Sequence, residues 1–212
     1  MKIKSFTFNV FQENTYVIYD DTQECIIIDP GCYEEEEKNI LKEFIKHKKL
    51  KPVKLINTHC HIDHILGNQF VCQNWSLELS VNKKDIPLLE SSESIANMYG
   101  FKKYEESPSP KNFLEDKDIL RFGINEFKIL FTPGHSPGHI CLYSEKHNLI
   151  IAGDVIFRNS IGRTDLPGGD HNTLINSINK KILPLPNTTK IYCGHGPYTD
   201  VGSERKNNPF LQ

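Results

Sequence analysis

The sequence predicts an α/β fold in which two β-sheets stack face to face and helices cover their outer surfaces. In each half of the chain, short β-rich runs come first and a segment with helical spacing of apolar residues follows. In both halves, candidate functional side chains stand where such runs end, which is where loops gather into a site. Two similar halves of this kind favour two sheets over one.

The first half begins with three strand-like runs, over residues 3–8, 16–19 and 25–28, the last two joined by an Asp20–Thr22 turn. The acidic run 34–37 suits the start of a helix, and the basic run 46–49 suits its end. Residues 53–56 then form an apolar run that predicts a buried strand.

A helix beginning near Ile65 and a strand over 77–81 are predicted next. Residues 91–112 are the least regular stretch, and we expect a mobile loop over the site or an exposed excursion. The second half predicts strands over 119–122, 127–131, 140–143 and 149–152. A helix follows with Leu174, Ile175, Ile178 and Ile182 on one face and Asp170 as its N-cap.

Composition limits the possible functions. A chain of 212 residues is most simply one domain, residues 1–212, with a core that needs no disulfides. The net charge of −2 offers no basic field for nucleic acid. The six cysteines show no paired spacing, and neither a signal peptide nor a run of transmembrane length is present. We therefore expect a soluble cytoplasmic protein that binds neither nucleic acid nor a membrane, in an oligomeric state that stays open.

Seven residues are candidate metal ligands. A lone histidine is more often an ordinary surface or core residue, but three histidines and an aspartate fall in one six-residue window directly after the run 53–56. The other three each follow a glycine near the end of a β-rich run. The set is His59, His61, Asp63, His64, His135, Asp154 and His195. Five imidazoles and two carboxylates suit two borderline metal ions that share ligands and activate a water molecule, which indicates a hydrolase.

The stretch Thr58-His59-Cys60-His61-Ile62-Asp63-His64, with Gly-His135, Gly-Asp154 and Gly-His195 downstream, resembles the metallo-β-lactamase superfamily. The resemblance implies the four-layer α/β/β/α sandwich of that superfamily. It also implies that His59, His61 and His135 hold one metal ion, that Asp63, His64 and His195 hold the other, and that Asp154 bridges them. Asp29 would support the histidine loop from behind. The two divalent ions expected are zinc, with iron or manganese as alternatives.

The segment 161–170 resembles the short single-domain type II glyoxalases, the hydroxyacylglutathione hydrolases. This resemblance implies hydrolysis of a small-molecule thioester, S-2-hydroxyacylglutathione, by a metal-bridging hydroxide that the catalytic residue Asp63 orients. Persulfide dioxygenases share the core of this segment. They imply the alternative, a mononuclear-iron enzyme acting on glutathione persulfide through His59, His135 and Asp154.

Substrate contacts are less defined. Arg163 is a candidate for pairing with a carboxylate of the substrate, and an ion pair with Asp165 or Asp170 is the alternative. Tyr198 is a candidate for lining the pocket, and ordinary packing is the alternative. His139 is expected to support the site rather than to bind metal. The chain ends soon after His195, so we expect it to bind glutathione without the C-terminal domain that longer glyoxalases use, and the identity of the thiol carrier stays open.

Overall fold

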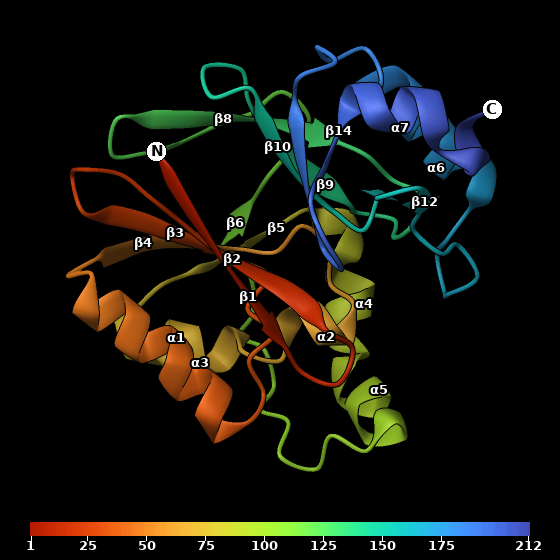
Figure 1. The fold of residues 1–212 in the computed structure, drawn as a ribbon. Helices are drawn as coiled ribbons and strands as arrows, with labels where there is room; N and C mark the ends of the chain where they lie inside the picture. The colour runs from red at the N-terminus through yellow and green to blue at the C-terminus, as the bar shows by residue number, and fades with distance from the viewer. The chain divides into compact units, whose positions relative to one another are not determined.

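The computed structural model describes all 212 residues, as two compact units whose placement relative to each other is not determined (Figure 1). The first unit comprises Met1–Phe113 and Arg121–Asn125, and the second comprises Leu114–Leu120 and Glu126–Gln212. Both contain strands and helices, so the expected mixed α/β class is confirmed. The prediction that residues 1–212 form one domain stays a prediction. None of the helices is both long enough and apolar enough to span a membrane.

The first sheet has the strand order β1-β2-β3-β4-β5-β6. Its strands are β1 (Lys2–Phe8), β2 (Glu13–Tyr19), β3 (Glu24–Ile28), β4 (Lys51–Ile56), β5 (Leu79–Val81) and β6 (Asn112–Phe113). Strands β1 to β3 are antiparallel, and β3 to β6 are parallel. The carboxyl ends of β3, β4 and β5 therefore meet at one edge, and the turn between β1 and β2 lies at that same edge.

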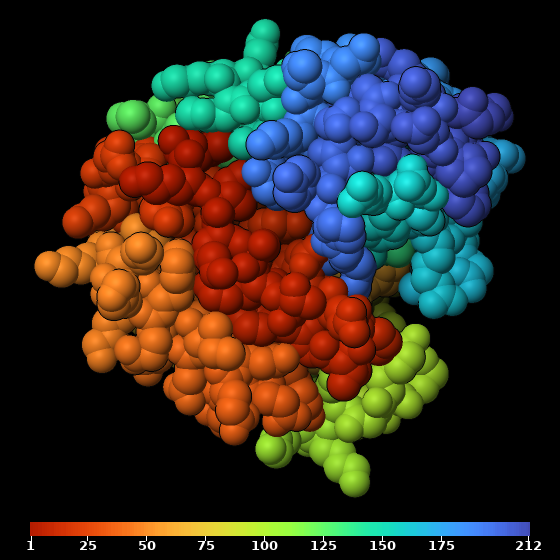
Figure 2. Space-filling view, in the orientation of Figure 1, coloured from red at the N-terminus to blue at the C-terminus, as the bar shows by residue number.

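The helices of the first unit come after strands β3, β4 and β5 in the chain. They are α1 (Glu35–His47), α2 (Ile62–Ile65), α3 (Asn68–Trp75), the 3-10 turn η1 (Lys83–Asp85), α4 (Ile86–Glu90) and α5 (Ser92–Tyr99). Helix α1 confirms the prediction, since the Glu37 carboxylate accepts from the Glu34 amide (3.1 Å) in a capping box and basic residues end the helix. Leu41 and Ile45 of α1 are buried in the first core. Figure 2 shows the surface of β1 and its turn, in red, next to that of α1, in orange.

The expectation of an irregular excursion over 91–112 is wrong for residues 92–99, whereas residues 100–111 contain no helix or strand. Residues Ser92–Tyr99 form α5, which ends at Gly100 in the left-handed region (φ +80°). The residues after it are tied to the unit, because Glu105 forms an ion pair with Lys38 (2.8 Å) and the Tyr104 hydroxyl donates to Ser92 (2.9 Å). The helix is too short to give a clear apolar period, and its serines hid it in the sequence.

The second sheet has the order β14-β13-β10-β9-β8-β7. Its strands are β7 (Ile119–Phe122), β8 (Asn125–Phe131), β9 (Ile140–Ser144), β10 (Leu149–Gly153), β13 (Lys190–Cys193) and β14 (Thr199–Asp200). All four strands predicted between 119 and 152 are present. Because β10 is parallel to β13 and antiparallel to β9, which is antiparallel to β8, the ends of β8, β10 and β13 share one edge. A separate hairpin, β11 (Ile156–Phe157) and β12 (Ser160–Ile161), follows β10.

The predicted helix of the second half is α6 (His171–Ser177), which continues as a π-helix, η2 (Ile178–Ile182). The Asp170 side chain accepts from the Thr173 amide (2.7 Å), which confirms the N-cap. Leu174, Ile178 and Ile182 are fully buried in the second core, as their spacing indicated. Helix α7 (Val201–Asn207) and the 3-10 turn η3 (Pro209–Leu211) end the chain.

Candidate metal centre

The first unit brings together four of the seven candidate ligands. His59, His61, Asp63 and His64 lie on the loop between β4 and α2 and at the start of α2. The ring centroids of His59 and His61 are 4.8 Å apart, and those of His59 and His64 are 4.1 Å apart. His59 and His64 are buried, whereas His61 and Asp63 are half-buried. This half of the predicted set is thus one compact group.

Asp29 holds this loop through Thr58, as expected. One Asp29 oxygen accepts from the Thr58 amide (2.7 Å), and the other accepts from the Thr58 hydroxyl (2.6 Å). That second oxygen lies 3.2 Å from His64 Nδ1, and the Thr58 oxygen lies 3.1 Å from His59 Nδ1. Both histidines therefore direct Nδ1 toward the Asp29–Thr58 pair, which leaves Nε2 as the atom that can bind a metal.

Three further side chains hold the backbone of this loop, and the sequence did not predict them. Asn57 and Asp85 follow the ends of β4 and β5, so the rule that found the histidines could have found them. Asn9 lies in the turn between β1 and β2 and carried no signal. The three hydrogen bonds run from Asn9 Nδ2 to the Asp63 carbonyl (3.0 Å), from Asn57 Nδ2 to the His64 carbonyl (2.9 Å) and from the Cys60 amide to Asp85 (2.9 Å).

Glu13 is fully buried behind the loop. One of its oxygens accepts from the Thr15 hydroxyl (2.9 Å), and the other lies 3.8 Å from His64 Nδ1. Burial raises the pKa of Glu13 well above its ordinary value, which favours the uncharged acid beside Asp29. A Cβ on Gly31 would lie 2.1 Å from a Glu13 oxygen, so packing requires glycine there.

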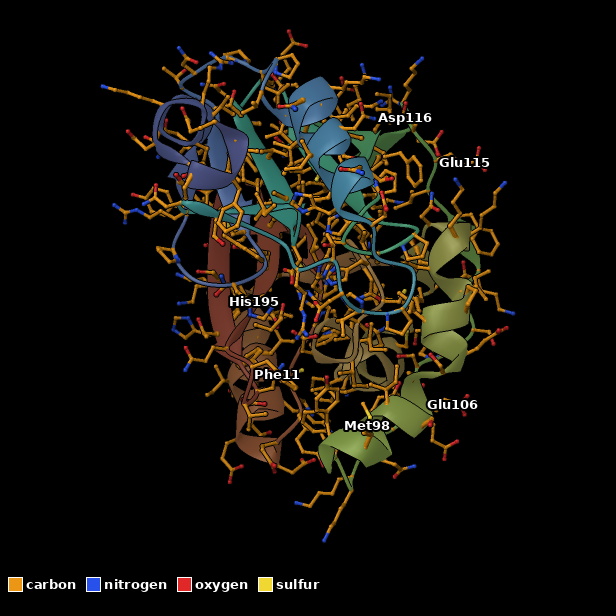
Figure 3. The ribbon with its side chains drawn as sticks, turned by 90° about the vertical axis from the view of Figure 1, so that its right-hand side faces the viewer. Phe11, Met98, Glu106, Glu115, Asp116 and His195 are labelled. Carbon is orange, nitrogen blue, oxygen red and sulfur yellow. The ribbon has the colours of Figure 1, made fainter.

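The second unit brings together the other three candidate ligands. His135 follows β8, Asp154 follows β10 and His195 follows β13, all at the shared edge of the second sheet. His135 Nε2 lies 3.5 Å and His195 Nε2 lies 3.4 Å from the same atom, Asp154 Oδ2. In Figure 3, His195 lies at the opposite end of this unit from Asp116.

Two contacts orient these side chains. His135 Nδ1 donates to the Arg163 carbonyl (2.7 Å), so Nε2 carries the lone pair. His139 Nε2 accepts from the Asp154 amide (3.0 Å), and its Nδ1 faces the Thr132 hydroxyl (3.2 Å). Because its Nε2 is used by a backbone amide, His139 supports Asp154 and is no ligand, as expected.

The chemistry and spacing of these groups fit divalent metal ions. Two ligand atoms that lie about 2.1 Å from one tetrahedral ion stand about 3.4 Å apart. Asp154 Oδ2 has this spacing from His135 Nε2 and from His195 Nε2, and Asp63 Oδ2 has it from His64 Nε2, at 3.5 Å. Imidazole nitrogen and carboxylate oxygen are donors that zinc, iron and manganese accept.

The two predicted substrate contacts are placed differently. Two Arg163 nitrogens, Nε and Nη2, donate to Asp165 at 2.7 Å, and this hydrogen bonding lowers the pKa of Asp165 to about 2. The ion pair that was the alternative for Arg163 is therefore present. Tyr198 is 61% exposed, and its ring is tilted against Tyr192 with centroids 6.1 Å apart. Contact of Arg163 and Tyr198 with a substrate stays a prediction.

A profile of the metallo-β-lactamase superfamily matches residues 8–195. The chain belongs to this superfamily. It is 37% identical to the hydroxyacylglutathione hydrolase GloC of Haemophilus influenzae over 212 residues. The matched region covers 100% of the chain and 98% of the relative. It is similar to the solved structure of the B3 metallo-β-lactamase BLEG-1, with a TM-score of 0.91, 36% identity and full coverage of both chains. It is also similar to TTHA1623 in a di-iron-bound form, with a TM-score of 0.88, 35% identity and coverage of 98% and 100%.

These relationships confirm the sequence predictions at the level of the superfamily. The fold class of the chain is that of its metallo-β-lactamase neighbours. The chain is a metallo-hydrolase of this superfamily, and its histidine-rich groups accord with divalent metal binding. All six cysteines are free thiols in the structure.

Proposed function

We propose that this metallo-hydrolase cleaves thioesters, with S-2-hydroxyacylglutathione as its substrate class. The observation that carries the proposal is the position of Asp154 Oδ2, 3.4 and 3.5 Å from the Nε2 atoms of His195 and His135. One carboxylate oxygen between two imidazoles is what a carboxylate shared by two ions requires. Similarity to the GloC protein over the full chain supports the thioester as substrate.

The proposal assigns His59, His61 and His135 to one divalent ion and Asp63, His64 and His195 to the other, with Asp154 shared. Zinc is the first candidate metal. The di-iron form of TTHA1623 supports iron as an alternative, and manganese accepts the same donors. When bound, the ions supply an activated water molecule and polarise the thioester carbonyl.

Asp63 is the catalytic residue of the proposal. Its side chain is half-buried, one of its oxygens lies 3.5 Å from His64 Nε2, and Asn9 fixes its backbone carbonyl. The Asp63 carboxylate accepts a hydrogen bond from the attacking water and so orients it toward the carbonyl carbon. The leaving thiolate needs little proton assistance, because a thiol has a pKa of about 8.5. No separate general acid is required.

The test measures metal content, hydrolysis of S-lactoylglutathione, and oxygen uptake with glutathione persulfide on the same purified protein. We expect two ions per chain, thioester hydrolysis and no oxygen uptake. His195→Ala should lower hydrolysis strongly, and Lys42→Ala, at an exposed site on α1, should not. One iron per chain, with oxygen uptake that survives in His195→Ala, would establish the persulfide dioxygenase instead. Cleavage of a chromogenic β-lactam without thioester turnover would also contradict the proposal.

A further inference from the structure

A cavity of about 370 Å³ opens in the second unit, between the β11–β12 turn and the start of α7. Its lining includes Arg158, Asn159, Tyr198 and Asn207, together with the acidic residues Asp200 and Glu204. In Figure 2 the turn, in cyan, lies against the blue surface of the C-terminal segment. The reaction proposed above uses none of these residues.

The cavity adjoins this unit's part of the candidate metal centre. Phe157, which precedes Arg158, packs its ring edge-on against the ring of His195, with centroids 6.1 Å apart. Tyr198 follows His195 by three residues. The cavity and this part of the candidate metal centre are therefore built on the same two segments, residues 157–159 and 195–200.

Arg158 is the one cation in the lining, and the two carboxylates beside it are already hydrogen-bonded within the protein. Both Asp200 oxygens accept from Ser203, one from its amide and one from its hydroxyl, each at 2.8 Å. Both Glu204 oxygens are also bound within the protein; they accept from Thr199 Oγ1 (2.6 Å), the Asn159 amide (2.9 Å) and Asn208 Nδ2 (2.8 Å). Arg158 is exposed, and its guanidinium forms no ion pair with a carboxylate of the chain.

Arg163 offers a less accessible cation. Its guanidinium already binds Asp165 through two hydrogen bonds of 2.7 Å, in the fork geometry that carboxylates prefer. A substrate carboxylate at Arg163 must displace Asp165, whereas one at Arg158 displaces no carboxylate of the chain. The Arg158 guanidinium has five N–H donors, and the side-chain amides of Asn159 and Asn207 line the same cavity. Such donors suit a carboxylate on a peptide.

We propose that this cavity binds the peptide part of an anionic thiol carrier, with a carboxylate of the carrier paired to Arg158 and the Tyr198 ring beside it. The inference rests on the proposed function, because the carrier is that of the thioester substrate. It assigns the main anion contact to Arg158 in place of Arg163.

The test measures binding, so it does not depend on turnover. Metal-loaded protein is titrated calorimetrically with S-methylglutathione, which cannot be hydrolysed, and with its diethyl ester, which lacks both negative charges. We expect Arg158→Ala to weaken binding of the acid by about tenfold or more, as the loss of a charge-assisted hydrogen bond implies. Arg158→Lys should fall between, and Lys42→Ala should bind like the wild type. The diethyl ester should bind all four proteins equally weakly.

Equal binding of the acid by wild type and Arg158→Ala would overturn the inference, as would a diethyl ester that binds wild type as tightly as the acid. A loss confined to Arg163→Ala would return the role to Arg163. If a coenzyme A thioether binds more tightly than S-methylglutathione, and this binding is lost in Arg158→Ala, then Arg158 binds a phosphate and the proposed carboxylate contact is wrong. If S-methylglutathione binds through Arg158 but no thioester is hydrolysed, the proposed function fails and the inference stands.

Discussion

The imidazole of His139 accepts a hydrogen bond from the backbone amide of Asp154, with 3.0 Å between Nε2 and the amide nitrogen. This contact fixes the tautomer of His139, whose Nδ1 faces Thr132. It also fixes the backbone that carries Asp154, the carboxylate that we assign to both ions. His139 is fully buried, so no water can replace the contact.

We expect His139→Leu to lower metal affinity by about 10- to 100-fold, the usual effect of removing a group that orients a ligand. His139→Gln should retain part of the metal affinity, because the glutamine amide oxygen can accept the same hydrogen bond. The measurement is the metal content that survives dialysis against graded chelator. Equal retention in His139→Leu and wild type, with both folded, would show that Asp154 needs no support from His139.

Asp63→Ala should reduce kcat for thioester hydrolysis by at least about a hundredfold, because the side chain is both a proposed ligand and the group that orients water. The metal content should fall from two ions toward one. Asn9→Ala, which removes only the contact to the Asp63 carbonyl, should have a smaller effect on both. Full turnover in Asp63→Ala with one ion per chain would transfer the catalytic role to another residue.

Removal of metal should abolish hydrolysis and leave most of the secondary structure. Each unit has its own apolar core, one around Ile27, Leu41 and Leu55 and one around Ile150, Leu174 and Ile191, and neither core needs a metal to stay buried. Circular dichroism and activity are followed through chelation and through reconstitution with zinc, iron or manganese. Free metal at a hundredfold excess over its dissociation constant should restore about 2.7 kcal/mol of stability. Hydrolysis that persists in protein shown to lack metal would refute the assigned nucleophile.

Asp20 predicts a pH dependence of stability. Burial, the largest single influence, raises its pKa, but hydrogen bonds from Thr22, Ile124 and Asn125 together outweigh it and lower the pKa below its ordinary value. A carboxylate with a lowered folded-state pKa stabilises the fold above its unfolded pKa, and this contribution is lost as the pH falls through the folded pKa.

Asp20→Asn should therefore cost about 2 kcal/mol at neutral pH and less below about pH 3.8. Urea unfolding of both proteins at neutral and acidic pH measures this. Asp21→Asn is the matched control, because the Asp21 side chain is 90% exposed and pairs only with Lys2 at the surface. A cost for Asp20→Asn that does not change with pH would mean that the carboxylate charge is not what stabilises the turn.

Gly162→Ala should disturb the centre through packing alone. Its Cβ would lie 1.9 Å from the Asp154 carbonyl oxygen and 3.1 Å from His135 Nδ1, so both ligand-bearing segments must move. We expect a loss of about 1–3 kcal/mol in stability and weaker metal retention. Gly100→Ala is the comparison, because it adds backbone strain (φ +80°) with no atom within 4 Å. Metal retention as low in Gly100→Ala as in Gly162→Ala would remove the packing explanation.

The sequence predicts those features of the fold and the site that are formed by residues close together in the chain. His59, His61, Asp63 and His64 are visible because they stand together after a strong strand signal, and Asp170 because an N-cap acts within three residues. The contact of Asp20 with Ile124 joins residues 104 positions apart and leaves no mark on either segment. Glu13 is similar, since a glutamate in a strand reads as exposed until the fold buries it. The motif around Arg163 was visible in the sequence, but the sequence did not show whether Arg163 pairs with a substrate, with Asp165 or with Asp170.

Asn9 connects the turn between β1 and β2 to the loop that carries the candidate ligands. Its side chain donates to Gly31 and Asp63, and its own amide donates to Glu37 at the start of α1 (2.6 Å). Val10, the next residue, is 81% exposed. Phe11 donates its backbone amide to the Asn9 oxygen, and its ring packs against Tyr99 and Phe101, with centroids 5.3 and 5.9 Å away. Position 10 can therefore take other side chains while Asn9 keeps the ligand loop in place. A library randomised at position 10 alone would change the surface of this turn without altering the hydrogen bond that holds the Asp63 backbone.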